Sequence, residues 1–149
     1  MTSDAMTVLT ARDCDREAIL QAFADPARLI VVSLCAAWCD TCTQFRAACE
    51  RLAQARPHAT FVWLDIEDDA AIAGDVDVEN FPTLAIYRGR SPLHFGVSVP
   101  HETVVGRLVD ALAEGAPTRS DVPDEVADLP GAFDRGQRGE SGTSATEAS

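Results

Sequence analysis

Lysine is absent from the sequence, so all 12 basic residues among its 149 are arginines. Any cation beside a reactive side chain must therefore belong to arginine or histidine. Long apolar runs are also missing: the first 30 residues hold no segment of signal-peptide length after a basic start, and no later run could span a membrane. We therefore expect a soluble cytoplasmic protein, in a compartment where thiols are kept reduced.

Basic residues are few beside the 24 acidic ones, which gives a net charge of −12 and a pI near 4.4. This charge argues against binding to nucleic acid or to an anionic membrane surface, because both are themselves negative. Solubility is a sufficient reason for an acidic surface. With 46% hydrophobic residues, the chain is long enough for one domain with its own core and a spare segment.

Two of the five cysteines, Cys39 and Cys42, form a C-x-x-C pair where an apolar strand gives way to a helix. In a reducing compartment this spacing favours a redox or metal site over a structural disulfide. A helix N-terminus favours a thiolate at Cys39, and Cys42, one turn away, can displace a bound substrate sulfur. A zinc site needs four ligands, and His58, His94 and His101 show no paired spacing. An inert pair of buried thiols is the third alternative.

Hydrophobic periodicity predicts alternating strands and helices through most of the chain. Residues 29–35 are apolar on both faces, as in a central strand that helices cover from both sides. The expected strands are Thr7–Leu9, Leu29–Cys35, Thr60–Ile66, Thr83–Arg88 and Leu93–Val97. The expected helices are Cys14–Ala24, one from near Cys42 to Ala55, a short one at Ala70–Ala73 and one that starts near Pro100. This order implies a mixed sheet with helices on both faces.

Three features fall in a characteristic order: the Ala36–Cys39 lead-in to the motif, the later Phe81–Leu84 segment, which reads Phe-Pro-Thr-Leu, and the turn at Gly89. In this order and spacing the sequence resembles the thioredoxin family from Thr7 to Glu114. The resemblance implies an α/β, thioredoxin-like three-layer fold, in which helices flank both faces of a central mixed β-sheet.

The resemblance also implies roles for the motif and its surroundings. Cys39 is the expected catalytic nucleophile, and Cys42 is the expected resolving thiol. The Phe-Pro turn resembles the cis-proline turn that packs opposite the dithiol in the family and offers backbone groups to an extended substrate. The expected substrate-binding residues are Trp38, Phe81, Pro82 and Thr83.

Three positions depart from the family pattern. Ser33 stands where the family commonly has a buried aspartate, and Trp63 stands where the neighbouring strand usually has a lysine. A serine hydroxyl is a poorer base than a carboxylate, so we expect slower resolution. Asp40 follows the first motif cysteine, and its carboxylate repels a thiolate at Cys39 and competes for the same N–H groups. Ser33 and Asp40 are therefore the residues expected to tune the acidity of the dithiol.

The other cysteines have different expected roles. Cys49 lies on the same predicted helix face as the second motif cysteine and is interpreted as core packing, with a second redox partner as the alternative. Cys35 ends the central strand close to the motif and is a candidate for thiol exchange. Cys14 begins the first predicted helix, where we expect partial exposure.

The two ends of the chain are expected to lie outside the domain, which gives a flexible segment 1–6, a thioredoxin-like domain 7–114 and an acidic tail 115–149. The tail is rich in Gly, Pro, Ser and Thr and has few large apolar residues, which predicts disorder for most of it. Val126, Leu129 and Phe133 have helix-like spacing, so this part of the tail could instead dock on a partner or on the domain itself.

These observations predict a thiol–disulfide oxidoreductase that reduces protein disulfides and contributes to redox homeostasis. Its partners would be protein disulfide substrates and an electron-donating reductase whose identity is open. We expect a monomer with no bound cofactor or metal. The alternative is a thioredoxin-fold interaction or adaptor module, in which the dithiol is slow or incidental and the surface around Trp38 and Pro82 binds partners.

Overall fold

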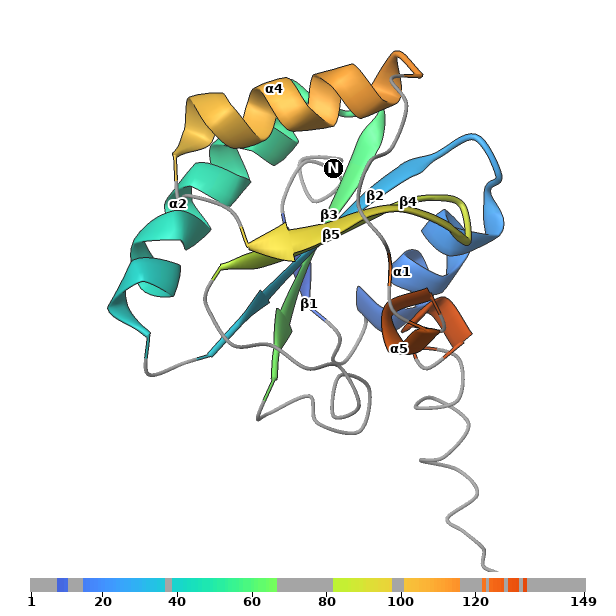
Figure 1. Ribbon diagram of the computed structural model, residues 1–149, viewed down its shortest axis with the longest axis horizontal. Coiled ribbons are helices and arrows are strands. Elements are labelled where there is room, and N and C mark those ends of the chain that lie inside the picture. Colours follow the sequence, from blue (N-terminus) through green and yellow to red (C-terminus); the bar gives the residue numbers. More distant parts are fainter. Residues whose placement is uncertain are drawn as a thin grey trace, which may run out of the picture.

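A computed structural model of the chain describes residues 8–10, 15–36, 39–66, 82–97, 101–115, 122, 124–127, 129–131 and 133 (Figure 1). Within these residues the strands form a five-stranded sheet in the order β1-β3-β2-β4-β5. Their bounds are β1 Leu9–Thr10, β2 Leu29–Cys35, β3 Ala59–Asp65, β4 Thr83–Arg88 and β5 Ser91–Val97. Strands β1 and β2 run parallel to β3, whereas β4 runs antiparallel to both β2 and β5. The predicted mixed sheet is confirmed.

Helices cover both faces of this sheet, as expected. Their bounds are α1 Asp15–Ala24, α2 Asp40–Ala55, α4 Glu102–Ala113 and α5 Asp124–Ala127. Helices α2 and α4 lie together on one face, while α1 and α5 lie on the other (Figure 1). The short helix predicted at 70–73 lies outside the described residues.

Strand β2 is the centre of the fold, because all seven of its residues are buried. Its side chains alternate between two apolar clusters. Leu29 and Val31 pack in the cluster that includes α2 and α4, whereas Ile30 and Val32 pack in the cluster that includes α1. A strand with two apolar faces is what the sequence pattern predicted.

Element boundaries differ from the sequence predictions by one or two residues. Helix α2 begins at Asp40 rather than near Cys42, and α4 begins at Glu102 rather than near Pro100. Strand β5 begins at Ser91, because Pro92 is accommodated opposite Tyr87 at an irregularity of the edge pairing. An edge strand tolerates proline, which lacks the N–H needed for pairing on both sides.

Gly89 forms the turn between β4 and β5 with a positive φ of 59°. Its N–H donates to the Arg28 carbonyl at 2.8 Å. A Cβ atom at this position would lie 2.9 Å from the Cα atom of Pro26, closer than real Cβ contacts come. Glycine is therefore required here both by the backbone conformation and by the neighbouring chain.

The segment after α4 contributes to the core beneath α1. Val126, Leu129 and Phe133 are each at most 1% exposed and belong to the same apolar cluster as Phe23. The hydroxyl of Tyr87 donates to the Val126 carbonyl at 2.7 Å. In the structure, this segment therefore docks on the domain itself, which is one of the alternatives that the sequence left open for the tail. Residues 134–149 lie outside the described part, where disorder stays a prediction.

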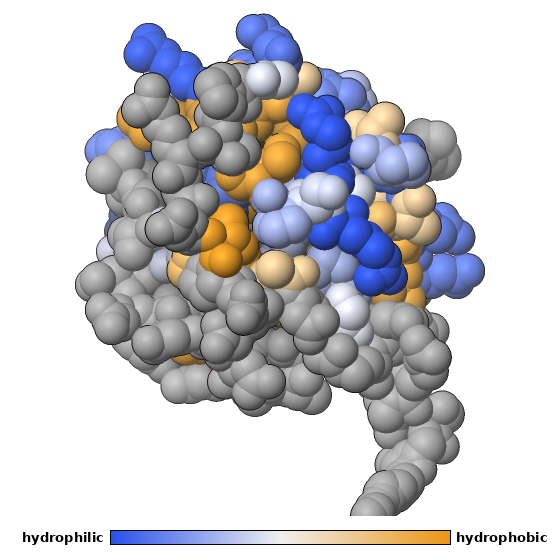
Figure 2. Space-filling view, turned by 45° about the vertical axis from the view of Figure 1, so that its right-hand side comes forward, coloured by the Kyte–Doolittle hydropathy of each residue, from blue (hydrophilic) through white to orange (hydrophobic). Residues whose placement is uncertain are grey.

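Few large apolar side chains of the described residues are exposed. Val104 of α4 is the exposed large apolar side chain among them, at 48%. On the face seen in Figure 2, apolar residues lie in separate patches that polar residues border. No described helix has both the length and the apolar character that crossing a membrane requires.

Candidate functional site

Cys39 lies immediately before helix α2, with an extended backbone (φ −91°, ψ 115°). Its carbonyl accepts hydrogen bonds from the Thr43 N–H at 3.1 Å and the Thr43 hydroxyl at 3.2 Å, and its own N–H donates to Ala36. The Cys39 thiol is free and partly exposed. The first N–H groups of a helix have no partner within it, so a thiolate here lies at the positive end of the α2 dipole.

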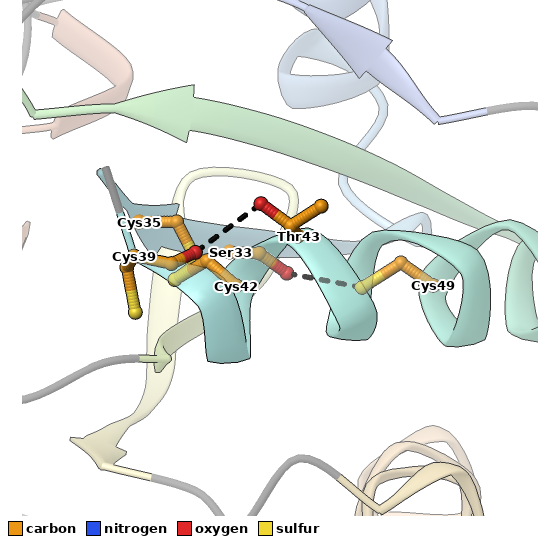
Figure 3. The surroundings of a disulfide bond; sticks show 6 residues. All are labelled: Ser33, Cys35, Cys39, Cys42, Thr43 and Cys49. Atoms are coloured by element: carbon orange, nitrogen blue, oxygen red, sulfur yellow. Dashed lines mark hydrogen bonds between the residues drawn. A yellow bond between two sulfur atoms is a disulfide. The ribbon is translucent and has the colours of Figure 1, made fainter. Parts of the chain in front are cut away.

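Cys42, in the first turn of α2, forms a disulfide with Cys35 at the end of β2. Figure 3 shows Cys35, Cys39 and Cys42 gathered at the N-terminal end of α2, with Cys49 further along the same helix. The Cα atoms of the bonded pair are 5.9 Å apart, within the usual range for a disulfide. Cys35 and Cys42 are at most 1% exposed, so the bond is buried, whereas Cys39 is partly exposed.

The partner of Cys42 differs from the one expected. The sequence predicted Cys39 and Cys42 as a dithiol, and in the structure the bond joins Cys42 to Cys35. The assignment of Cys39 and Cys42 as catalytic stays a prediction. Strand alternation puts Cys35 on the side of β2 that faces α2, together with the other odd-numbered residues of the strand. Nothing in the sequence, however, favoured Cys35 over Cys39 as the disulfide partner of Cys42.

Ser33 makes its contact with Cys49. The Ser33 hydroxyl and the Cys49 sulfur lie 3.5 Å apart in the core between β2 and α2. Burial raises the pKa of the Cys49 thiol to about 11, although the hydrogen bond with Ser33 and the charge of Arg46 act in the opposite direction. Cys49 is 1% exposed, which agrees with the interpretation as core packing. The influence of Ser33 on the motif stays a prediction.

Trp63 is the register partner of Ser33 on β3, so the two departures from the family pattern are neighbours in the sheet. Its ring packs against Phe45 with the centroids 6.5 Å apart, and the guanidinium of Arg46 lies 5.1 Å from the ring centroid. An aromatic ring beside a serine leaves no unpaired buried charge at these two positions, which explains why both departures occur together.

The structure describes three of the five remaining predicted site residues. Asp40 is exposed and is the first residue of α2. Pro82 and Thr83 are buried at the start of β4, and Thr83 pairs with Leu34, the neighbour of Cys35. The antiparallel register therefore brings the Pro82–Thr83 segment to the same sheet end as the cysteines. Trp38 and Phe81 lie outside the described residues.

Asp65 is a residue that the sequence analysis did not select. It ends β3 as the register partner of Cys35, and the following N–H, that of Ile66, donates to the Cys35 carbonyl at 2.9 Å. Asp65 is only 5% exposed. Its neighbours Phe61 and Trp63 on the same side of β3 belong to the cluster that includes α2. A buried carboxylate thus shares a sheet face and a register position with Cys35.

The thioredoxin family profile matches residues 10–105, and the chain belongs to the thioredoxin family. It is similar to thioredoxin from Ophiophagus hannah (28% identical over 67 residues, 45% of this chain) and to thioredoxin-2 from Saccharomyces cerevisiae (32% over 68 residues, 46% of this chain). Among solved structures, Fasciola hepatica thioredoxin is 27% identical with a TM-score of 0.56, and the match covers 70% of this chain and 97% of that one.

The match spans 64% of the length of the first of these curated relatives and 65% of the second. It therefore leaves about a third of each relative without a counterpart in the alignment. The family membership rests on the profile match, which covers more than half of the chain.

Proposed function

We propose that this chain is a thiol–disulfide oxidoreductase that reduces disulfide bonds of other proteins through Cys39 and Cys42. The observation that carries the proposal is the free, partly exposed Cys39 at the N-terminus of α2, three residues before Cys42. Membership of the thioredoxin family supports it. The nucleophile in such a reaction is a thiolate, and Cys39 lies at the positive end of the α2 dipole.

The proposed reaction has two exchange steps and begins with the Cys35–Cys42 bond reduced. The Cys39 thiolate attacks one sulfur of the substrate disulfide, which forms a mixed disulfide and releases the other substrate sulfur as a thiolate. The Cys42 thiolate then attacks the Cys39 sulfur and releases the second substrate thiolate. Two electrons have passed from the protein to the substrate, and a Cys39–Cys42 disulfide remains.

An electron-donating reductase of open identity would restore the dithiol, and no bound cofactor or metal takes part. We further propose that Trp38, Phe81, Pro82 and Thr83 form the substrate surface; the buried start of β4 at the sheet end that carries Cys35 supports this for Pro82 and Thr83. We also propose that the protein is a monomer and that it works in the cytoplasm. The cytoplasm suits this activity, because thiols are kept reduced there.

Reduction of insulin disulfides by dithiothreitol, followed as turbidity, tests the proposal. We expect the wild-type protein to accelerate the reaction and Cys39→Ser to return it to the rate with dithiothreitol alone. Cys49→Ser is the matched control, because it removes a buried thiol from the same helix, and it should keep the wild-type rate. Full activity of Cys39→Ser would overturn the assignment.

A second candidate function is an interaction module of the same fold. The observation that favours it is the engagement of Cys42 in a buried bond to Cys35, which removes the resolving thiol while the bond persists. In the insulin assay, a folded wild-type protein without turnover would support this candidate against the oxidoreductase.

A further inference from the structure

We propose that Cys35 is a third exchange cysteine, which takes over the disulfide from Cys39 after each reaction and leaves the chain with a Cys35–Cys42 bond and a free Cys39. The inference rests on the proposed function, because it begins from the Cys39–Cys42 disulfide that reduction of a substrate would leave. It adds to that function an oxidised resting state in which the nucleophile, Cys39, is a free thiol.

Cys42 has two possible disulfide partners at the N-terminal end of α2 (Figure 3). Cys35 lies on the neighbouring strand end, with its Cα atom 5.9 Å from that of Cys42, and Cys39 lies three residues earlier on the same chain turn. The backbone of Cys35 is fixed by pairing with β3, where its carbonyl accepts from Ile66 at 2.9 Å. Both partners are therefore available to Cys42 from fixed secondary structure, with the strand end on one side and the helix start on the other.

The step is an ordinary thiol–disulfide exchange within one molecule. The Cys35 sulfur, once deprotonated, attacks the Cys42 sulfur of the Cys39–Cys42 bond, so the Cys35–Cys42 bond forms and the Cys39 sulfur leaves as a thiolate. The number of disulfides is unchanged, and no external oxidant or reductant takes part. The proton lost by Cys35 passes to the Cys39 thiolate or to solvent, and Asp65 is the carboxylate in register beside Cys35.

Burial decides which sulfur is best left free. Cys35 and Cys42 are at most 1% exposed, whereas Cys39 is partly exposed at the positive end of a helix. A disulfide carries no charge and suits the apolar core, while a thiolate is stabilised where water and the helix dipole reach it. Buried Cys49 shows the direction of the effect: burial raises the pKa of its thiol to about 11, so less of it is thiolate at a given pH.

The exchanged state changes what the site can do next. With Cys42 bonded to Cys35, Cys39 can still attack a partner, but no free thiol on α2 is placed to release that partner. The oxidised chain would hold a mixed disulfide at Cys39 until the internal bond is reduced. The reduced chain would instead turn over through two thiols.

The test maps which cysteines are oxidised after a single reaction. The fully reduced, full-length protein is mixed with excess insulin without dithiothreitol, quenched in acid, and labelled with N-ethylmaleimide in denaturant. After reduction and a second label, trypsin cleavage following Arg28 and Arg46 yields one peptide that contains Cys35, Cys39 and Cys42 but not Cys49. Fragment ions from backbone cleavage between the three cysteines then show which of them carry the first label.

The inference predicts that Cys35 and Cys42 escape the first label because they are bonded, and that Cys39 carries it in clear excess over Cys35. Protection of Cys39 and Cys42 with Cys35 labelled would overturn the inference and leave the proposed function intact. First label on all three cysteines would mean that insulin was not reduced, and both proposals would fail together.

Two variants give matched controls. Cys35→Ala keeps the buried position apolar, and after reaction it should leave Cys39 and Cys42 bonded to each other and therefore without the first label. Cys49→Ala removes another buried cysteine on the α2 side and should reproduce the wild-type label pattern. Label on Cys39 in oxidised Cys35→Ala at the wild-type level would overturn the inference. The wild-type pattern decides the question even where a variant folds poorly.

Discussion

Phe133 lies in the segment that follows α4, and its ring is 0% exposed in the cluster beneath α1. The ring centroid is 5.5 Å from that of Phe23, which itself packs edge-on against Tyr87. Truncation to alanine removes the ring from a site that neighbouring side chains cannot fill. Substitutions of this kind destabilise proteins by about 3–5 kcal/mol. Because a domain is stable by only about 5–15 kcal/mol in total, Phe133→Ala should remove a large part of the folding free energy.

Urea unfolding followed by circular dichroism measures this change. We expect the free energy of unfolding of Phe133→Ala to fall by about 3 kcal/mol or more, and the melting temperature to fall by about 10 °C. Val104→Ala is the control, because Val104 is 48% exposed and its loss should change stability by no more than about 0.5 kcal/mol. A loss below about 1 kcal/mol for Phe133→Ala would refute the claim that residues beyond α4 belong to the core.

Three further predictions concern charge, thiol reactivity and backbone. The hydrogen bonds from Arg56 hold the pKa of Asp110 below its usual range, so the pair stabilises the protein above the ordinary carboxyl pKa and loses this effect as pH falls through the lowered one. Arg56→Gln should therefore lose up to about 1 kcal/mol in urea unfolding at pH 7, since Asp110 is half exposed, and the difference from wild type should vanish in acid. Iodoacetamide should alkylate the native Cys49 thiol at least about a hundredfold more slowly than a thiol of ordinary pKa, as mass spectrometry would show; comparable rates would mean that the thiol is not buried. Gly89→Ala should destabilise by about 1–3 kcal/mol in the same unfolding assay, whereas Gly96→Ala, which meets only ordinary contacts, should not.

The fold was predictable because its pattern is local. The two-sided apolar run of β2 and the helical repeats of α2 and α4 determine which faces are buried, and these faces assemble as expected. The tail was harder to predict. Three apolar residues in a polar segment bury too little surface to fold alone. Their burial is complete only because they join the apolar cluster that includes Phe23 and Tyr87.

The sequence selected the candidate site residues, whose roles stay a prediction, but it did not predict the disulfide that the structure has. Sequence spacing identified Cys39 and Cys42, since three residues correspond to one turn at a helix start. The bond between Cys42 and Cys35 depends on how closely the end of β2 approaches the first turn of α2, a distance that no local pattern encodes. Asp65 was missed for the same reason, because its closeness to Cys35 comes from the pairing register of two strands whose first residues, Leu29 and Ala59, are 30 residues apart in the sequence.

The most direct test of the central claim, that Cys39 is the attacking nucleophile, is to trap its covalent intermediate. Reduced Cys42→Ser protein is mixed with insulin, quenched in acid and digested, and the linked peptides are identified by mass spectrometry. The account predicts an insulin peptide joined through a disulfide to Cys39, and its absence when Cys39→Ser is added to the same protein. An adduct at another cysteine, or no adduct from a folded protein, would contradict it.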